Sequence, residues 1–452
     1  MDKFRIEYTD EVIASNGGLA LAGFVINSDQ FKNLLETINI DDSSKEFKNA
    51  DIIKTYLAML CLGKNNYEDV DDFKDDKFFK SCIGLEKLPS KETLRQRLEE
   101  MSGSDIEEKL KRYNTEIIKK YGDLTPCCES EYIPVDFDVT PFDNSGSHKE
   151  GVSNTYKMVD GYAPMLTYIG DTGFMLNNQL REGKAHSNCE GTAAYIRRTL
   201  EYGSQTTNAI LLCRFDSGNE CVENMDIVNS FENARYLMKK NFRRESTEGY
   251  IDFAKSKNCV KESPRTGKEV YYHTKIVELP LKDDKGKIIK LVQTRLVVRL
   301  IERIIDKKGN HLLIPMQDID AWHTSLAEKH SAQEVIRFYE DHGTSEQYHS
   351  EFKTDMDMER LPSGKFSTNS LVITIGNLAF NILRGIGQNT LSSGKVKRKR
   401  KIKRMRIRKV LQDIMYMACQ YMIKCKQKTI KLATCNAYAR PMEFAYNIFT
   451  RM

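Results

Sequence analysis

The chain has 452 residues, of which 40% are hydrophobic and 29% are charged, and its formal net charge is +5. That length holds roughly two to four domains with ample core, and the composition is ordinary for a soluble protein. The longest apolar run, Leu371–Leu383, is too short and too often interrupted by polar residues to span a bilayer. Since the first twelve residues contain no apolar signal core, we expect an intracellular protein with no membrane partner.

Eleven cysteines are scattered along the chain, and they do not form two C-x2-C pairs at zinc-binding spacing. An odd number of thiols without a disulfide framework suits a reducing cytosol. The cysteines therefore predict a cytoplasmic protein and argue against a structural zinc site.

Positive charge is concentrated in Lys395–Lys409, here called the basic run, which has eleven Lys or Arg and no acid. Without those eleven charges the net charge of +5 becomes −6. A local basic cluster usually meets phosphate, so we expect it to bind DNA. Two alternatives stay open: a solvated tail that only aids solubility, or a segment that folds against acids of the same chain. The expected DNA contacts are Lys397, Arg398, Lys399, Arg400, Lys401, Arg404, Arg406 and Arg408.

Residues 1–125 have mostly helical patterns. Asp51–Gly63 shows helical apolar spacing with a glycine at its end, and Lys87–Met101 contains Ser90 as a helix N-cap. The two helices could form a DNA-reading helix-turn-helix, or they could belong to an ordinary helical bundle.

Tyr132–Thr140 alternates apolar and acidic residues, which predicts a strand with Asp136 and Asp138 on one face. Two acids on one face are costly unless they are solvated, paired or bound to metal. The alternative is a plain exposed edge strand, in which both acids are solvated.

Two further strands are expected at 163–169 and 174–180, followed by a loop in which Arg181 is a candidate DNA contact or simply a loop residue. The apolar run at 209–215 is typical of a strand buried on both faces. It ends at Asp216, and residues just past such strands line the ligand crevice of an open α/β sheet. Asp216 could also be a simple helix N-cap.

Residues 243–322 are rich in Val, Ile, Tyr and Thr and contain glycine turns, which predicts a β-meander inserted into an α/β unit. Helices are expected at 332–354, 370–384 and 407–422. The predicted fold class is α/β, with these segments: a helical DNA-binding or dimerisation domain at 1–125, a first core part at 126–242, the β insertion at 243–322, a second core part at 323–390, and a basic helical region at 391–452.

On the helix expected at 332–354, four polar residues share one stripe. Tyr339, His342, Glu346 and Lys353 stand at offsets that fall within roughly 60° of each other at ~100° per residue. A surface helix with charges at random is the plain alternative.

Three acids could meet at one site: Asp138 (with Asp136 beside it), Asp216 and Glu346. Each stands at a strand end or on the polar stripe. Carboxylate oxygens are the ligands that Mg²⁺ and Mn²⁺ prefer, and two such ions about 3.5–4 Å apart can hold both reacting oxygens of a phosphodiester. The set therefore predicts a two-metal phosphoryl-transfer site.

The order of strand and Asp, strand and Asp, long insertion, then helix and Glu resembles the DDE transposases of bacterial insertion sequences. The polar stripe is similar to their Y-x2-R-x3-E-x6-K signature, with His342 where the signature has Arg. Three further stretches resemble the branch known as DDE group 1 transposases: Asp136–Thr140, Arg214–Gly218 and Gly343–Ser363.

The resemblance implies an RNase H-like core and a metal-dependent transposase. Asp138, Asp216 and Glu346 would be the catalytic ligands of two Mg²⁺ or Mn²⁺ ions, with Asp136 a weaker candidate because Asp-x-Thr follows at Asp138. Lys353 matches a residue that holds DNA phosphate, and Tyr339 matches another DNA contact. At His342 a neutral imidazole lacks the fork of an arginine, so the phosphate contact there is in doubt.

By the same resemblance, the enzyme would act on double-stranded DNA, as a homodimer in the synaptic complex. It would bind terminal inverted repeats, cleave the ends with water and join the 3′ ends to target DNA. The acid Glu351 lies on another face of the helix and is expected to be solvated. Trp322, the one tryptophan, is expected in the core or stacked on a flipped base. Two other functions stay open: a catalytically decayed or domesticated DNA-binding protein, and a metal-dependent nuclease.

Overall fold

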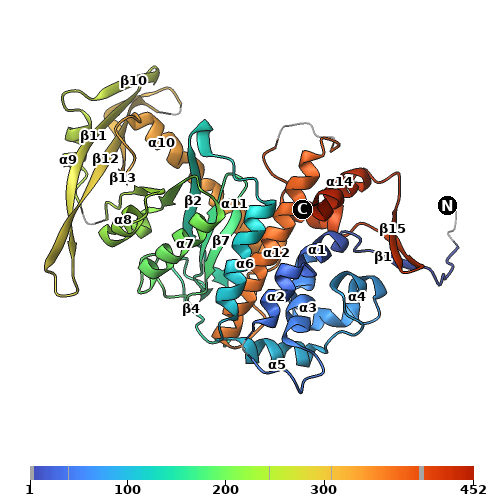
Figure 1. Ribbon diagram of the computed structural model, residues 1–452. Coiled ribbons are helices and arrows are strands. Elements are labelled where there is room, and N and C mark those ends of the chain that lie inside the picture. Colours follow the sequence, from blue (N-terminus) through green and yellow to red (C-terminus); the bar gives the residue numbers. More distant parts are fainter. Residues whose placement is uncertain (1–4, 39, 244, 307, 397–401, 452) are drawn as a thin grey trace. The chain divides into compact units, whose positions relative to one another are not determined.

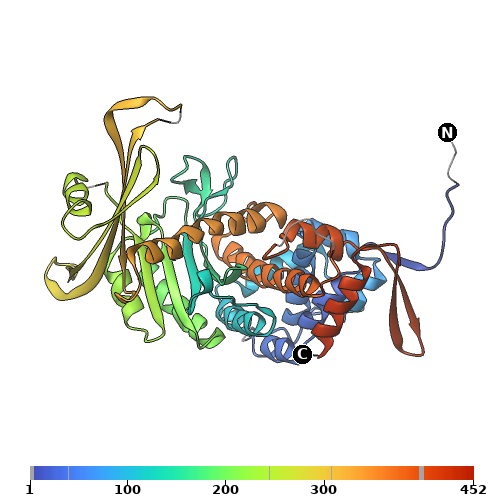
Figure 2. The ribbon, with the colours of Figure 1, turned by 90° about the horizontal axis from the view of Figure 1, so that it is seen from above.

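The computed structural model describes residues 5–38, 40–243, 245–306, 308–396 and 402–451. The chain forms two compact units (Figure 1, Figure 2). Unit 1 comprises Met1–Asp123, Phe142–Tyr162 and His349–Met452, and unit 2 comprises Leu124–Pro141 and Ala163–Tyr348. Each unit is therefore built from segments that are far apart in the sequence.

A mixed nine-stranded sheet forms the centre of unit 2, in the order β10-β11-β12-β13-β9-β8-β2-β6-β7. Its strands are β2 (Tyr132–Val139), β6 (Met165–Ile169), β7 (Phe174–Gln179), β8 (Ile210–Phe215), β9 (Ala234–Lys239), β10 (Val260–Arg265), β11 (Lys268–Lys282), β12 (Ile288–Ile305) and β13 (His311–Thr324). Strand β8 runs parallel to both β2 and β9, and the other pairs are antiparallel. The predicted α/β class and the strands expected from 132 to 215 are confirmed.

Helices cover both faces of this sheet beside β8. Leu211 packs against Gly203 of α7 (Thr192–Thr206), whereas Leu212 shares a core cluster with Val335 of α10 (Ala332–Glu340). Because neighbouring residues of a strand point to opposite faces, every second residue after Leu212 points to the α10 face. The remaining helical elements of the unit are η2 (Cys127–Glu129), η3 (Ser217–Asn219), α8 (Val222–Asn229), α9 (Glu248–Ala254), η4 (Asp341–Thr344) and α11 (Ser345–Ser350), the last of which crosses into unit 1.

The predicted β-meander is present as β11, β12 and β13, which pair antiparallel in sequence order. It is not a separate sheet. Residues Trp322–Thr324 pair with Leu237–Lys239 of β9, so the meander continues the central sheet of unit 2.

Unit 1 is mainly helical. Its helical elements are α1 (Leu19–Ile26), α2 (Asp29–Glu36), α3 (Asn49–Cys61), η1 (Tyr67–Phe73), α4 (Lys77–Ile83), α5 (Lys91–Met101), α6 (Ile106–Tyr121), η5 (Glu351–Asp355), α12 (Phe366–Ser392), α13 (Ile407–Val410), η6 (Leu411–Met415) and α14 (Ala439–Arg451). The Ser90 hydroxyl accepts a hydrogen bond from the backbone N–H of Thr93, which confirms the predicted N-cap of α5. Helix α12 is long and apolar enough to cross a membrane, yet 94% of its most apolar stretch is buried inside the protein.

Unit 1 also contains a small sheet of β3 (Phe142–Asp143), β4 (Ser153–Asn154) and β5 (Asp160–Tyr162). One prediction for this unit was wrong: the helix expected at 407–422 ends at Met415, and a hairpin follows.

That hairpin consists of β14 (Cys419–Lys424) and β15 (Gln427–Leu432), and β14 also pairs with β1 (Val12–Ala14). Its two-residue turn at Cys425 and Lys426 has φ values of 49° and 66°, which is backbone geometry that a helix cannot continue through.

Candidate active site

Asp138 and Asp216 lie side by side at the carboxyl ends of β2 and β8. The parallel register pairs Asp136 with Arg214 and Phe137 with Phe215, so the next residue of each strand is one of the two acids. Neighbouring strands lie about 4.8 Å apart. The two predicted strand-end acids are therefore neighbours on the α10 face of the sheet. They stand at the carboxyl ends of the parallel strands, which is where open α/β sheets bind ligands.

The Asp216 side chain is half-buried, and a residue of its own loop holds its carboxylate. The side-chain amide of Asn219, a fully buried residue, donates a hydrogen bond of 2.7 Å to Asp216 Oδ1. Burial and the negative charge of Asp138 raise the pKa of Asp216. A positive charge between the two carboxylates would offset this repulsion.

Asp136, the weaker candidate metal ligand, lies in a buried ion pair. Both of its carboxylate oxygens accept hydrogen bonds from Arg214, at 2.6 and 2.7 Å, and His342 Nδ1 lies 2.8 Å from Oδ1. Burial alone would raise the pKa of Asp136, but the Arg214 guanidinium and His342 hold it below its usual value. The expectation that Asp136 binds metal does not fit this geometry, because its oxygens are already engaged in a buried ion pair.

The helix expected at 332–354 is divided into α10, the 3-10 turn η4, α11 and the π-helical turn η5. Arg214 Nη1 donates to the carbonyl of Phe338, and Ser345 Oγ donates to Asp138 Oδ2 at 3.2 Å. These bonds fasten the helical segment along the acid-bearing face of the sheet. They place Glu346, which is exposed, one residue after the residue that bonds Asp138.

The other residues of the polar stripe are engaged within the protein. The Tyr339 hydroxyl donates to the carbonyl of Phe215, and the buried His342 contacts Asp136. Lys353, in unit 1, forms an ion pair of 2.7 Å with Glu359. As DNA contacts, these three residues stay predictions, and His342 in this position is covered rather than open to a phosphate.

Arg181 and Trp322 are also buried. Arg181 donates to Gln179 Oε1 and to the Ser187 carbonyl, and its guanidinium lies over the Tyr195 ring. Trp322 packs in the core cluster of α10 and meets Tyr339 edge to face. Trp322 thus takes the core position that was one of its two expected roles, while the predicted DNA contact of Arg181 would require the side chain to leave its site.

The prediction that Glu351 is solvated was wrong. It is 1% exposed, and Arg384 and Arg404 each place a guanidinium nitrogen 3.0 Å from one of its oxygens. The backbone N–H of Ile407 donates to the same carboxylate at 2.9 Å. The helical spacing predicted that Glu351 lies on another face than the polar stripe. That face is not solvated, because α12 and the end of the basic run cover it.

The basic run can be followed only in part. Lys397, Arg398, Lys399, Arg400 and Lys401 lie outside the described residues. Arg404 pairs with Glu351, and Arg406 and Arg408 both pair with Asp355, at 2.7 and 3.1 Å. These three arginines therefore pair with acids of the same chain, which was one of the two alternatives to DNA binding.

Sequence reasoning missed Arg214, Asn219 and Ser345. An arginine inside the apolar run 209–215 was the available signal, because a buried guanidinium requires a counter-charge and Asp136 is an acid on a neighbouring strand. Nothing in the local sequence distinguishes Asn219 or Ser345 from ordinary loop and helix residues.

Asp138 and Asp216 form a pair of oxygen donors that suits a divalent cation, and Glu346 directly follows Ser345, the residue that bonds Asp138. Among the residues that the structure describes, no three His, Cys, Asp or Glu side chains stand close enough together to hold a metal ion. The Glu346 side chain is exposed, and its part in a metal site stays a prediction.

The fold and these acids define an α/β protein with a carboxylate pair at the ends of adjacent parallel strands. The model of the family described as transposase DDE domain group 1 matches residues 2–448, and the chain therefore belongs to this family of transposases. No curated protein matches the chain. Among solved structures, the piggyBac transposase in its synaptic complex with hairpin DNA is similar, with a TM-score of 0.40 and 10% identity over 89% of this chain and 76% of that chain.

Proposed function

We propose that this transposase binds the inverted repeats at the ends of its element, cleaves the DNA there and joins the 3′ ends to target DNA. The chemistry would take place on an RNase H-like core at Asp138, Asp216 and Glu346. The observation that carries the proposal is the side-by-side position of Asp138 and Asp216 at the ends of β2 and β8, together with the bond from Ser345 to Asp138.

The three acids would hold two Mg²⁺ or Mn²⁺ ions. Such ions, when bound, supply the charge that stabilises the attacking and leaving oxygens of a phosphodiester. The donor set fits them, since all its ligand atoms are carboxylate oxygens and two of the acids are adjacent and mutually repelling.

The other residues of the site would keep the acids in position. Asn219 holds one oxygen of Asp216, and Ser345 holds one oxygen of Asp138. Arg214 neutralises Asp136 and His342 contacts it, so that a third carboxylate on the same face does not compete for cations. This leaves the metal-binding charge to Asp138 and Asp216 on the sheet and to Glu346 on the helix.

The test is cleavage of a DNA substrate carrying the element's ends, with Mg²⁺, by three variants: Asp138→Asn, Asp216→Asn and Glu346→Gln. Each change keeps the shape of the side chain and removes a metal-binding charge, so each should abolish cleavage while DNA binding persists. Asp341→Asn is the matched control, since it removes an exposed acid from the same helical segment and should cleave normally. A near-normal rate for any of the three would remove that residue from the metal site.

The same assay separates the remaining functions. Joined products on a target plasmid are expected of a transposase, whereas cleavage without joining would indicate a nuclease. If the wild type bound DNA but gave no metal-dependent cleavage, the protein would be a DNA-binding descendant of a transposase.

A further inference from the structure

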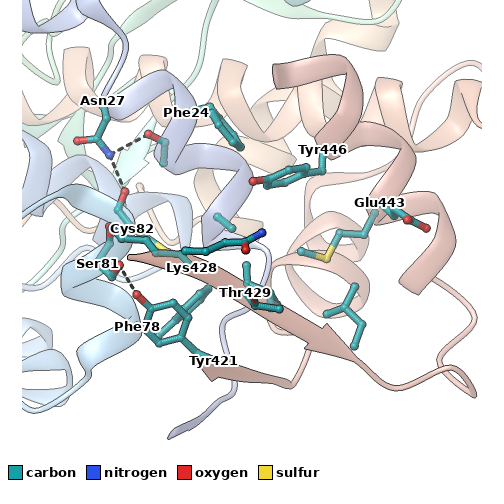
Figure 3. Close-up of a pocket in the computed structure, with 16 residues that line it drawn as sticks. Phe24, Asn27, Phe78, Ser81, Cys82, Tyr421, Lys428, Thr429, Glu443 and Tyr446 are labelled. Atoms are coloured by element: carbon teal, nitrogen blue, oxygen red, sulfur yellow. Dashed lines mark hydrogen bonds between the residues drawn. The ribbon is translucent and has the colours of Figure 1, made fainter. Parts of the chain in front are cut away.

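Unit 1 contains a groove of about 600 Å³ between the hairpin β14–β15 and helices α1, α4 and α14 (Figure 3). Its wall is mainly apolar and includes two edge-to-face aromatic pairs, Phe24 with Tyr446 and Phe78 with Tyr421. Four consecutive residues of β15, from 427 to 430, line it. Because consecutive strand residues point to opposite faces, a groove that touches all four lies along the edge of the strand. We call it the β15 groove.

Among the strands that the structure describes, the sheet order is β1-β14-β15, so the edge of β15 in this groove has no neighbouring strand there. Lys424 pairs with Gln427 across a two-residue turn, and such a closing pair exchanges backbone hydrogen bonds. Hydrogen-bonded and non-hydrogen-bonded pairs alternate along the two strands from this closing pair. Residues of β15 in the non-hydrogen-bonded pairs, which are Lys428, Ile430 and Leu432, therefore point their N–H and C=O groups away from β14, toward the free edge. The groove therefore offers a row of backbone donors and acceptors beside aromatic walls, which is the geometry that accepts an added strand.

At the opposite edge of the same sheet, residues 5–11 lead into β1 as an extended arm (Figure 1, Figure 2). Two large apolar side chains on this arm, Ile6 and Tyr8, are 84% and 100% exposed. They stand two residues apart, so in a strand they would share one face. The seven residues of the arm span about 23 Å when extended, and the six residues of β15 span about 20 Å. The arm is therefore long enough to pair along the whole of β15.

The charges of the arm and of the hairpin are complementary. The arm has Glu7, Asp10 and Glu11 against a single Arg5, whereas the hairpin 419–432 contains four lysines and no acid. In the groove wall, the Lys428 ammonium donates to the Ser81 carbonyl, at 3.4 Å. Opposite charges across two strands favour pairing, and like charges oppose it.

We propose that the arm of a second copy of this chain docks along the β15 groove as an added strand, with Tyr8 among the aromatic side chains, and that the exchange is mutual. The chain's own arm starts from the far edge of the sheet and would have to cross β14 to reach this groove. The arm of a second copy approaches the free edge from outside. A mutual exchange closes after two copies, so the expected species is a dimer.

The test reverses the charges on each side separately. One variant carries Glu7→Lys, Asp10→Lys and Glu11→Lys on the arm, and the other carries Lys428→Glu and Lys431→Glu on the edge. Sedimentation velocity over a concentration series should show dimers for the wild type and an association constant roughly 10–100-fold lower for each variant alone. An equimolar mixture of the two variants should recover the dimer. In the heterodimer the lysines of the reversed arm meet the glutamates of the reversed edge, and the acidic arm meets the wild-type lysines.

A second pair of variants tests the backbone contact. Ile430→Pro removes an N–H that faces outward, so it should leave the hairpin folded but weaken the dimer. Ile430→Val keeps that N–H and should dimerise like the wild type. A monomeric wild type, dimers that survive both charge reversals, or a mixture that fails to recover the dimer would each overturn the proposal. If the chain's own arm filled the groove, the wild type would be monomeric.

Discussion

Two buried carboxylates, one in each unit, are neutralised by arginine in different ways. Asp136 in unit 2 meets Arg214 directly across two neighbouring strands, and both residues are about 2% exposed. Glu351 in unit 1 meets Arg384 and Arg404, which come from α12 and from the end of the basic run. The first pair follows from strand register, whereas the second depends on three separate segments meeting.

The difference matters for the helical segment that carries Glu346. The Asp136 cluster includes His342, four residues before Glu346, and the Glu351 cluster begins five residues after it. Glu346 itself is exposed between the two clusters. The candidate catalytic acid Glu346 is thus preceded in the chain by a residue of the unit 2 cluster and followed by a residue of the unit 1 cluster. Substitutions in the two clusters can be compared directly.

The largest effect is expected from Glu351→Ala. It leaves two guanidinium groups without their counter-charge, one of them fully buried, so the free energy of unfolding should fall by about 3–5 kcal/mol. Chemical denaturation measures the loss. Glu340→Ala is the control. The Glu340 side chain, which pairs with Arg299, is 61% exposed, so its loss should lower the free energy of unfolding by less than about 1 kcal/mol. Equal losses for the two variants would show that Glu351 is no more important to stability than a surface acid.

Asp136→Asn and Asp138→Asn should separate stability from activity. Asp136→Asn leaves Arg214 buried with a neutral partner and should lower the free energy of unfolding by about 2–3 kcal/mol. Asp138→Asn removes a repulsion with Asp216 and should change stability by less than about 0.5 kcal/mol. Under conditions where both variants are folded, Asp138→Asn should lose more cleavage activity. The reverse order of activity would mean that Asp136 is the ligand.

The stability that Glu351 provides should depend on pH. Burial would raise the pKa of this carboxyl, but Arg384 and Arg404 hold it below its usual value. A lowered folded pKa means that the contribution is complete above the unfolded value of about 4.3 and is lost as the pH falls through the folded value. The stability difference between the wild type and Glu351→Gln should therefore shrink below about pH 4.3. A difference that stays constant as the pH is lowered well below that value would argue against an ionised Glu351.

The smallest effect is expected from the described part of the basic run. Arg406→Gln with Arg408→Gln should lower stability by about 1–2 kcal/mol through Asp355, and should change the slope of log K against log salt for DNA binding by less than about 1. Replacing Lys397, Arg398, Lys399, Arg400 and Lys401 by Gln should instead flatten that slope by about 2–5. Salt titrations of DNA binding measure both. An unchanged slope in the second variant would support a solubility tail.

Local patterns in the sequence were sufficient for several elements. The alternation in 132–140 predicted β2, the apolar run at 209–215 predicted β8, and Ser90 predicted the start of α5. These features depend on neighbours within one strand or turn, where spacing decides which side chains share a face. The same spacing placed Asp138 and Asp216 at strand ends before the order of the strands was known.

Contacts between distant segments decided the rest. The register of β2 on β8 engages Asp136 with Arg214, and α12 together with the end of the basic run covers the face of the helix that carries Glu351. Residues 419–432 form a hairpin whose strand β14 also pairs with β1, more than 400 residues earlier. The sequence by itself determined which residues could carry the chemistry. The tertiary structure decided which of them are neutralised, because burial makes an unpaired charge too costly and its partner can come from anywhere in the chain.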